Sequence, residues 1–353
     1  MWFIDTFRPA TAMPCTLSVL IPTYNYGRYL PEAIDSVLGQ DFTDFELLVS
    51  DDASTDDSTA VISHYAAKDP RVRFQLHPAN LGMVANWNWC LQHARGDYVK
   101  YLFGDDCLAS RHSLGRMVAL LENNPGATMA ATGRLVLDEN SAVTGLWDDW
   151  GKTGLFDGPP SILRCLRANH NLIGEPSAAI FRRAAATRGF DPTMRQIVDL
   201  EMWFHLLLQG GFVYSPEPLC AFRRHGVQQT AINRQSRVGN IETVRLLTQY
   251  LEPVAQRTGL RPDSLVRRRI IFRSLYYVRK SATSHPQFEK MSELLQAQLP
   301  RRWWIFCWLL HRMTRPFENL SRSVRLRRLQ KTAQVATGQL AFLRALRSPQ
   351  GHS

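Results

Sequence analysis

The sequence lacks any long apolar segment. Its longest uninterrupted apolar run, from Trp303 to Leu310, has eight residues, whereas a helix needs roughly 20 to cross a bilayer. We therefore expect no classical membrane-spanning helix. Residues 1–15 also lack a basic start followed by an apolar stretch, so they are expected to form an N-terminal extension without a secretory signal, which places the protein in the cytoplasm.

Cysteine is scarce, and its spacing excludes two classes of protein. None of the six cysteines belongs to a C-x-x-C pair, so the sequence fits neither a disulfide scaffold nor a zinc knuckle. We expect reduced and mostly buried thiols. They are Cys15, Cys90, Cys107, Cys165, Cys220 and Cys307.

Acidic residues are rare in the last third of the chain. Residues 230–353 carry 23 Lys and Arg against six Asp and Glu, whereas residues 1–229 carry 19 and 25. A strongly basic tail of this kind usually faces a membrane surface, nucleic acid or an acidic partner. The overall composition, 45% hydrophobic and 21% charged over 353 residues, is that of a folded protein with one large or two smaller domains.

Between residues 17 and 120, short β-rich runs alternate with segments of helical periodicity. Residues 16–24, 45–52, 72–76 and 97–106 are apolar, β-branched or aromatic and end at turn residues, as strands do. The intervening segments place apolar residues three and four apart, which indicates helices. This order predicts an α/β fold with a mostly parallel sheet, helices on both faces and ligands at the carboxyl ends of the strands.

Polar residues follow three of these predicted strands. The first strand runs into Asn25, the second into Asp51 and Asp52, and the fourth into Asp105 and Asp106. Carboxylates that meet at one sheet edge repel each other unless a cation joins them, so a divalent metal is the simplest explanation. The alternative is that each carboxylate only caps the helix that follows it.

These stretches, in their order and spacing, resemble family 2 of the glycosyltransferases, which are inverting enzymes with the GT-A fold. The resemblance covers about residues 16–230. One motif alone would be weak evidence, but the ordered set is specific. The matching stretches are VLIPTYN (19–25), LVSDDASTDDS (48–58), NLGMVANWN (80–88), ARGDYVKYLFGDD (94–106), VDLEMW (198–203) and FRRHG (222–226).

The resemblance implies a nucleotide-sugar site at the first two strand ends. Pro22 and Tyr24 would flank the base beside Asn25, Asp52 would accept a hydrogen bond from the ring N–H, and Asn80 would belong to a turn near the donor. A carboxylate can accept from the imide N–H of uracil, guanine or thymine, so UDP-, GDP- and dTDP-sugars all remain possible donors. The alternative for Tyr24 is ordinary core packing.

The same resemblance implies a metal and diphosphate site. Asp106 would bind Mg²⁺ or Mn²⁺ directly, Asp105 would contact ribose or a metal-bound water, and His225 would be a further metal contact. Hard carboxylate oxygens suit both ions. Arg223 would pair with the phosphate oxygens.

Inverting transfer needs one general base to take the proton of the acceptor hydroxyl. The family's base position corresponds to Asp199, although Val198 stands where the family often has Glu. An apolar neighbour favours a raised pKa for Asp199 through desolvation. For Glu201 we expect a surface or helix-dipole role. Aromatic residues of the loop at 145–175 are expected either to stack on sugars or to anchor the loop.

The tail, residues 231–353, is expected to be a separate basic helical region. Within it, residues 301–331 combine Trp303, Trp304 and Trp308 with arginines, as in a helix that lies in the interface of a membrane. The alternative is a helix packed on the catalytic domain. Nucleic acid is not expected as a partner, because no RNA-binding or zinc motif is present.

The sequence therefore predicts a metal-dependent inverting glycosyltransferase on the inner face of the cell membrane. Its acceptor would be a hydroxyl of a lipid-linked or growing surface saccharide. Two alternatives remain open at this point. One is a catalytically silent nucleotide-sugar-binding or scaffold subunit of polysaccharide assembly, and the other is a cytosolic protein whose tail mediates oligomerisation.

Overall fold

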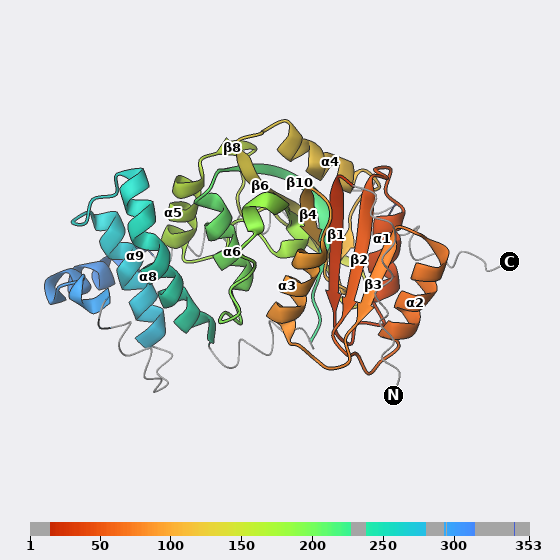
Figure 1. The fold of residues 1–353 in the computed structure, drawn as a ribbon. Coiled ribbons are helices and arrows are strands. Elements are labelled where there is room, and N and C mark those ends of the chain that lie inside the picture. The colour runs from red at the N-terminus through yellow and green to blue at the C-terminus, as the bar shows by residue number, and fades with distance from the viewer. Residues whose placement is uncertain (1–14, 227–237, 280–292, 294, 315–341, 343–353) are drawn as a thin grey trace.

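One mixed β-sheet organises the first two thirds of the chain (Figure 1). The computed structural model describes residues 15–226, 238–279, 293, 295–314 and 342. Within them the sheet has ten strands in the order β3-β2-β1-β4-β9-β6-β10-β5, with β7 beside β6 and β8 beside β10. The strands are β1 (Leu17–Thr23), β2 (Phe45–Asp51), β3 (Val72–Leu76), β4 (Tyr98–Tyr101), β5 (Cys107–Leu108), β6 (Ala127–Leu137), β7 (Val143–Trp147), β8 (Gly154–Phe156), β9 (Ala179–Arg182) and β10 (Gly211–Arg223).

Two strands of the main path, β9 and β5, run antiparallel to the others. Strands β3, β2, β1 and β4 are mutually parallel. Strand β9 runs antiparallel between β4 and β6, and β10 is again parallel to β6. The expected α/β sheet is confirmed, with β9 as an antiparallel insertion and with the fourth predicted strand shortened to four residues. The carboxyl ends of β1, β2 and β4 meet at one edge, as the sequence predicts.

Helices cover both faces of the sheet (Figure 1). Alternation in β1 shows why: Val19 and Ile21 enter one hydrophobic core, while Leu20 enters the other. Helices α1 and α4 cover the first face, and α3 and α6 cover the second. The helices are α1 (Leu30–Leu38), α2 (Ser58–Lys68), α3 (Met83–His93), α4 (Ser113–Glu122), α5 (Gly158–Ala168), α6 (Val198–Leu207), α8 (Val238–Thr258) and α9 (Leu265–Arg279), with short 3₁₀ turns η1 (Pro176–Ala178) and η2 (Arg183–Ala186).

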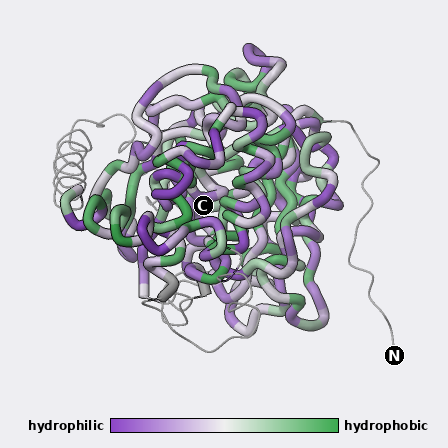
Figure 2. The backbone as a smooth tube through the Cα atoms, turned by 90° about the vertical axis from the view of Figure 1, so that its left-hand side faces the viewer, coloured by the Kyte–Doolittle hydropathy of each residue, from purple (hydrophilic) through white to green (hydrophobic). Residues whose placement is uncertain are grey.

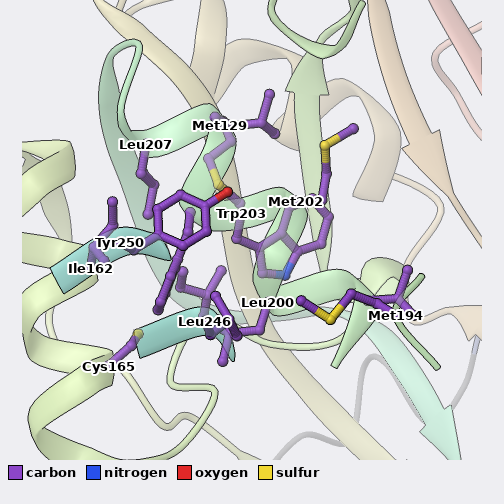
Figure 3. Close-up of a cluster of buried hydrophobic side chains, with 14 of the residues drawn as sticks. Met129, Ile162, Cys165, Met194, Leu200, Met202, Trp203, Leu207, Leu246 and Tyr250 are labelled. Carbon is purple, nitrogen blue, oxygen red and sulfur yellow. The ribbon is translucent and has the colours of Figure 1, made fainter. Parts of the chain in front are cut away.

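The C-terminal helices share a hydrophobic core with the sheet region. Buried residues of α8 and α9 belong to the same continuous cluster as those of α3, α5 and α6. In Figure 3, Leu246 and Tyr250 of α8 lie against Leu200 and Trp203 of α6. The predicted helical region at 231–353 is thus a packed extension of the sheet domain in its described part.

Hydrophobic and hydrophilic segments alternate along the whole backbone (Figure 2). Of the helices that the structure describes, none is long and apolar enough to cross a membrane. Residues 301–314 form a helix that follows α9 and lies at the left end of the molecule in Figure 1. The remainder of the predicted membrane segment, 315–331, lies outside the described residues.

Candidate active site

The ends of β1 and β2 are tied together by side chains of the loops that follow them. The backbone N–H of Asn25 donates to Ser54 Oγ at 2.9 Å, and Asn25 Oδ1 accepts from the N–H of Thr55 at 2.8 Å. Asn25 has a φ of 57°, a conformation that asparagine tolerates better than most residues. Tyr24 next to it is 47% exposed. Core packing for Tyr24 is therefore wrong, and its ring is available to a ligand.

Asp52 fixes a turn beside this loop. Its Oδ1 accepts from the N–H of Leu81 at 2.6 Å and its Oδ2 from the N–H of Gly82 at 3.0 Å. Asn80 Nδ2 donates to the carbonyl of Asp52 at 3.0 Å. Gly82 has a φ of +89° and open space where a side chain would begin, so backbone can be approached there. Asp52 and Asn80 thus lie together, as predicted, with the Asp52 carboxylate already engaged by two backbone donors.

Asp51 is a candidate that the sequence did not single out from its neighbour. Its Oδ2 accepts from the N–H of Ser54 at 2.9 Å. Its Oδ1 is buried and has no hydrogen-bond partner in the described part of the chain. A buried acceptor without a donor carries a cost of about 1–3 kcal/mol, so Asp51 is the carboxylate here that a donor group of a ligand would satisfy. Pro22, two residues before Tyr24, is buried in β1.

The Asp105-Asp106 pair follows the carboxyl end of β4, where the sequence predicts a metal site. Asp106 is 1% exposed, its Oδ2 accepts from Ser177 Oγ at 2.5 Å, and its Oδ1 accepts from the N–H of Arg223 at 2.9 Å. Burial and the adjacent Asp105 raise the pKa of Asp106 well above its ordinary value. A cation beside the pair would reverse this effect, because it stabilises the ionised form.

His225, which follows β10, contacts Asp105. Its Nε2 lies 3.0 Å from Asp105 Oδ2, and its ring lies 5.2 Å from Tyr29 and 6.0 Å from Tyr26. Its Nδ1 is buried without a hydrogen-bond partner among the described residues. If Nε2 donates its proton to Asp105, Nδ1 carries a lone pair, as a metal ligand requires.

These residues fit a metal that is shared with its substrate. No three His, Cys, Asp or Glu side chains in the described ranges converge closely enough to enclose an ion by themselves. Mg²⁺ usually takes one or two carboxylates from the protein and completes its shell with phosphate and water oxygens. Asp106 and the unpaired Nδ1 of His225, with Asp105 between them, match that requirement.

Arg223 has an environment different from the predicted phosphate contact. Its side chain is 1% exposed. Nη2 donates to Glu32 Oε2 at 2.7 Å, Nε donates to the carbonyl of Asp105 at 2.7 Å, and Nη1 donates to Ser141 Oγ. The guanidinium also lies 4.7 Å from the centre of the Tyr29 ring. Because its donors are spent on protein acceptors, Arg223 holds the Asp105-Asp106 turn in place and is not directed at a diphosphate.

Asp199 is the second residue of α6 and is partly exposed. Its Oδ1 accepts from the N–H of Leu200 at 2.8 Å, and its Oδ2 accepts from Asn171 Nδ2 at 2.9 Å. Burial, helped by the nearby charge of Glu175, raises the pKa of Asp199 to about 7. A carboxylate with this pKa is matched to proton transfer near neutral pH.

A single loop connects the predicted base and the predicted metal ligand. Asn171 contacts Asp199, and Ser177, six residues later, contacts Asp106. Neither Asn171 nor Ser177 was predicted, because an isolated Asn or Ser in a loop carries no sequence signal. The buried Nζ of Lys100 supports this loop from below, donating to the carbonyl of Ser177. Six residues span at most about 20 Å, which limits how far apart Asn171 and Ser177, the partners of Asp199 and Asp106, can lie.

The wall beside Asp199 is charged and partly aromatic. Arg134 is 2% exposed and pairs with Asp149 at 2.9 Å and with Glu175. Its guanidinium lies 5.1 Å from the centre of the Trp147 ring. Trp150, by contrast, is 2% exposed and packs on Phe156, Phe212 and Tyr214. Trp150 therefore anchors the loop, and Trp147, which is only partly buried, remains available to an acceptor.

The prediction of a surface role for Glu201 is wrong. The residue is fully buried, and its carboxylate accepts from both terminal nitrogens of Arg188, at 2.8 and 2.6 Å, and from Tyr250 Oη at 2.7 Å. The sequence hid this because Tyr250 comes from α8, 49 residues downstream. Glu201 is a structural link between α6 and α8.

A cavity of about 570 Å³ lies away from these residues, between α3 and η2. Its lining arginines are already paired: Arg183 Nε donates to the carbonyl of Gly96 at 2.6 Å, Arg182 Nε donates to the carbonyl of Ala127 at 2.8 Å, and Arg188 pairs with Glu201. The strand-end cluster, with its unpaired acceptor and raised carboxyl pKa values, is therefore the better candidate for the reaction.

Comparison with known proteins identifies the family of this chain. Residues 18–190 match the model of the family described as Glycosyl transferase family 2. An uncharacterized protein of Mycobacterium tuberculosis is 30% identical over 247 residues, which cover 66% of this chain and 74% of that protein. The chain belongs to glycosyl transferase family 2. It is accordingly an enzyme that transfers a sugar from a nucleotide-sugar donor.

This family 2 glycosyltransferase also resembles a named relative and a solved structure. The putative glycosyltransferase EpsE of Bacillus subtilis is 39% identical over 124 residues, 35% of this chain and 44% of EpsE, so the chain spans under half the length of that relative. The structure of TarS 1–349 from S. aureus in complex with UDP-GlcNAc has a TM-score of 0.54 at 17% identity and covers 86% of this chain and 92% of the TarS chain. The likeness confirms the expected GT-A architecture.

Proposed function

We propose that this enzyme transfers a sugar, with inversion, from a nucleoside diphosphate donor to a hydroxyl of a lipid-linked or growing cell-surface saccharide. The observation that carries the proposal is the loop 171–177, which contacts Asp199 at one end and Asp106 at the other. The loop thus ties a carboxylate with a pKa of about 7 to the buried acidic pair, which supports a single site for both. A displacement at an anomeric carbon needs two parts: a general base for the acceptor hydroxyl and a site for the leaving diphosphate.

Asp199 acts as the general base. Its free carboxylate lone pair takes the proton of the acceptor hydroxyl while the acceptor oxygen forms a bond to the anomeric carbon. The bond from that carbon to the diphosphate oxygen breaks, and its electron pair leaves with the nucleoside diphosphate. The hydrogen bond from Asn171 orients the carboxylate, and burial, with a smaller contribution from Glu175, keeps its pKa high enough to accept the proton.

The donor nucleotide is placed at the ends of β1 and β2. The exposed ring of Tyr24 covers the base beside Pro22, and the carboxylates of Asp51 and Asp52 accept from its N–H groups or from ribose. Asn25 and Asn80 hold the two loops that carry these residues. An imide N–H occurs in uracil, guanine and thymine, so the proposal covers UDP-, GDP- and dTDP-sugars.

Asp106 and His225 would hold Mg²⁺ or Mn²⁺ with Asp105 next to them. When bound, such an ion neutralises the charge that develops on the leaving diphosphate. The chain's own contribution is to keep the pair in place: Ser177 and the backbone of Arg223 hold both Asp106 oxygens, and the Arg223 side chain holds the carbonyl of Asp105.

The donor site is tested by isothermal titration of the full chain with UDP, GDP and dTDP, each with and without Mn²⁺. We expect one diphosphate to bind in a metal-dependent manner and Asp106→Asn to remove that dependence. The matched control is Asp57→Asn, which changes an exposed carboxylate at the start of α2. No binding by any of the three nucleotides, or equal binding by both variants, would overturn the proposed donor site.

The enzyme is further proposed to associate peripherally with the inner face of the cell membrane. The helix 301–314 turns one side inward: Trp304 contacts Phe272 of α9 at 4.8 Å, and His311 contacts Tyr276 at 5.1 Å between ring centres. Its predicted membrane tryptophans are all partly buried. Trp303 lies under Arg268, at 3.8 Å from the guanidinium carbon to the ring centre. The tryptophans predicted to lie at headgroup depth, Trp303, Trp304 and Trp308, therefore lie partly against the protein.

The opposite side of the same helix suits a lipid surface better. Ile305, Phe306, Leu309 and Met313 are 51, 46, 49 and 70% exposed. Their spacing places them on one helix face, which begins and ends at exposed arginines. Apolar side chains flanked by positive charge match an interface rich in anionic lipid.

Vesicle co-sedimentation tests this surface. Wild-type protein is expected to bind phosphatidylglycerol-containing vesicles more strongly than pure phosphatidylcholine vesicles, and Phe306→Ser with Leu309→Ser should abolish the binding. Leu155→Ser is the control, because Leu155 is 55% exposed on β8, away from this helix. Binding that survives the double substitution would overturn the assignment.

A further inference from the structure

The start of the catalytic helix α6 is held by a residue of the C-terminal helical region. The residue that precedes α6, Ile197, provides no side-chain cap. Instead, the carboxylate of Glu242 in α8 accepts from the backbone N–H groups of Arg195, Gln196 and Ile197, at 2.5, 2.8 and 2.9 Å. Glu242 lies 45 to 47 residues downstream of these donors and is 4% exposed.

This contact is stronger than an ordinary surface contact. A buried carboxylate is costly unless its oxygens are hydrogen-bonded, and here three backbone donors converge on one group. The donors precede the first turn of α6, where the helix dipole also favours a negative charge. Glu242 therefore acts as a cap delivered from another helix, and the segment 195–197 has a fixed position relative to α8.

Asp199 is two residues beyond the capped segment. Its Oδ1 is bound to the N–H of Leu200 in its own helix turn, so the carboxylate moves with that turn. We propose that Glu242 is a positioning residue: by fixing residues 195–197 it sets the first turn of α6 so that Asp199 faces the acceptor hydroxyl. This inference rests on the base role proposed above for Asp199.

A second contact between the same helices makes the arrangement rigid. Tyr250 of α8 donates to Glu201 Oε1 at 2.7 Å, one half-turn after Asp199. Leu200 and Trp203 of α6 pack against Leu246 and Tyr250 in one core (Figure 3). The first turn of α6 is thus held at its start by Glu242 and along its side by Tyr250. The basic C-terminal region completes the catalytic site in addition to any part it plays at a membrane.

Substitution of Glu242 tests the inference in the full-length protein. In Glu242→Gln one acceptor oxygen becomes an amide donor that cannot accept from a backbone N–H, so at least one of the three hydrogen bonds and the negative charge at the helix start are lost. We expect kcat to fall at least about tenfold, since misplacement of a catalytic group by about 1 Å can cost about a hundredfold. The Kd of the nucleoside diphosphate should change less than about twofold, because α6 does not touch the strand-end donor site.

The pH profile separates positioning from simple loss of stability. A loosened first turn admits water to Asp199, whose carboxyl pKa is raised by burial first and by Glu175 second. The acid limb of kcat should therefore move to lower pH in Glu242→Gln. Glu242→Asp, which keeps the charge, should restore part of kcat. Glu252→Gln in the same helix is the control, because Glu252 lies ten residues after Glu242, its side chain is 56% exposed, and its ion pair is with Arg267 of α9 and not with the start of α6.

Three results would overturn the inference. They are an unchanged kcat in Glu242→Gln, an activity loss that merely follows the folded fraction with an unchanged acid limb, and an equal loss in Glu252→Gln. Failure of the underlying function is distinguishable from these. An active Asp199→Asn variant would refute the proposed base, whereas an inactive Asp199→Asn beside a fully active Glu242→Gln refutes the positioning role alone.

Discussion

The ionisation of Asp199 determines how the rate of sugar transfer should depend on pH. Its pKa is raised from 3.8 to about 7 by burial and by Glu175. Only the carboxylate can accept a proton, and with this pKa about one tenth of the enzyme is ionised at pH 6 and about nine tenths at pH 8. We therefore expect kcat/KM to fall about tenfold between pH 8 and pH 6.

Two substitutions near Asp199 should move this acid limb, the fall of kcat/KM at low pH, in opposite directions. Asn171→Ala removes a donor that stabilises the carboxylate, so the pKa should rise; a hydrogen bond to a charged group is worth about 1.5–3 kcal/mol, or roughly one to two pH units. Glu175→Gln removes a nearby negative charge, so the pKa should fall. Opposite shifts from two residues that both contact the site are not expected from general destabilisation.

The same pKa makes a prediction about stability. Because the folded-state pKa of Asp199 lies above its unfolded value, protonation favours the folded protein, and this contribution is full below about pH 4 and is lost as the pH rises through 7. Asp199→Asn removes the ionisable group. The variant should be inactive but more stable than wild type above pH 7, by up to about 4 kcal/mol from a shift of about three units.

The assay is release of nucleoside diphosphate in the presence of acceptor from pH 5 to pH 9, with the nucleotide Kd measured over the same range. If the nucleotide Kd stays constant over this pH range, the acid limb of the rate belongs to the chemical step. An acid limb near pH 4 in wild type, or shifts in the same direction for Asn171→Ala and Glu175→Gln, would refute the reasoning. Chemical denaturation at pH 5 and pH 8 checks the stability of Asp199→Asn.

Three further substitutions test the scaffold. Trp150→Ala should cost about 3–5 kcal/mol in a urea titration, because it empties a fully packed aromatic site; a loss under about 1 kcal/mol would contradict the anchoring role. Glu201→Gln leaves Arg188 without its charged partner and should cost about 1–3 kcal/mol, measured by thermal unfolding, whereas a neutral effect would show that the contact is dispensable. Gly82→Ala forces an L side chain into a φ of +89° and should lower stability by about 1 kcal/mol. It should also weaken nucleotide binding in titration, and unchanged affinity would place the donor elsewhere.

The sequence was informative where local patterns carry the structure. Apolar, β-branched or aromatic runs that end at turn residues located the first three strands to within a residue or two at each end, and the strand ends brought Asn25, Asp52 and Asp106 to one edge as expected. These features depend on neighbours within a few residues. The antiparallel strand β9 was not predicted, because its four residues resemble any short apolar run.

Residue roles that depend on partners far away in the chain could not be predicted from the sequence. Arg223 was assigned to a phosphate through the family resemblance, yet its partner Glu32 is 191 residues away in α1. Glu201 was placed at the surface because Tyr250 lies in another helix. A side chain's partner decides its role, and without the fold neither partner is visible.

The loop 171–177 has a kinetic consequence. Asn171 orients the base and Ser177 holds the metal aspartate, so a displacement of one end is transmitted through only five intervening residues to the other. If Asp106 shifted toward a bound diphosphate and cation, its hydrogen-bond partner Ser177 would shift as well, and the loop would carry the displacement toward Asn171. The enzyme is then expected to bind its substrates in a compulsory order, donor before acceptor, and to leave the donor unhydrolysed until the saccharide arrives.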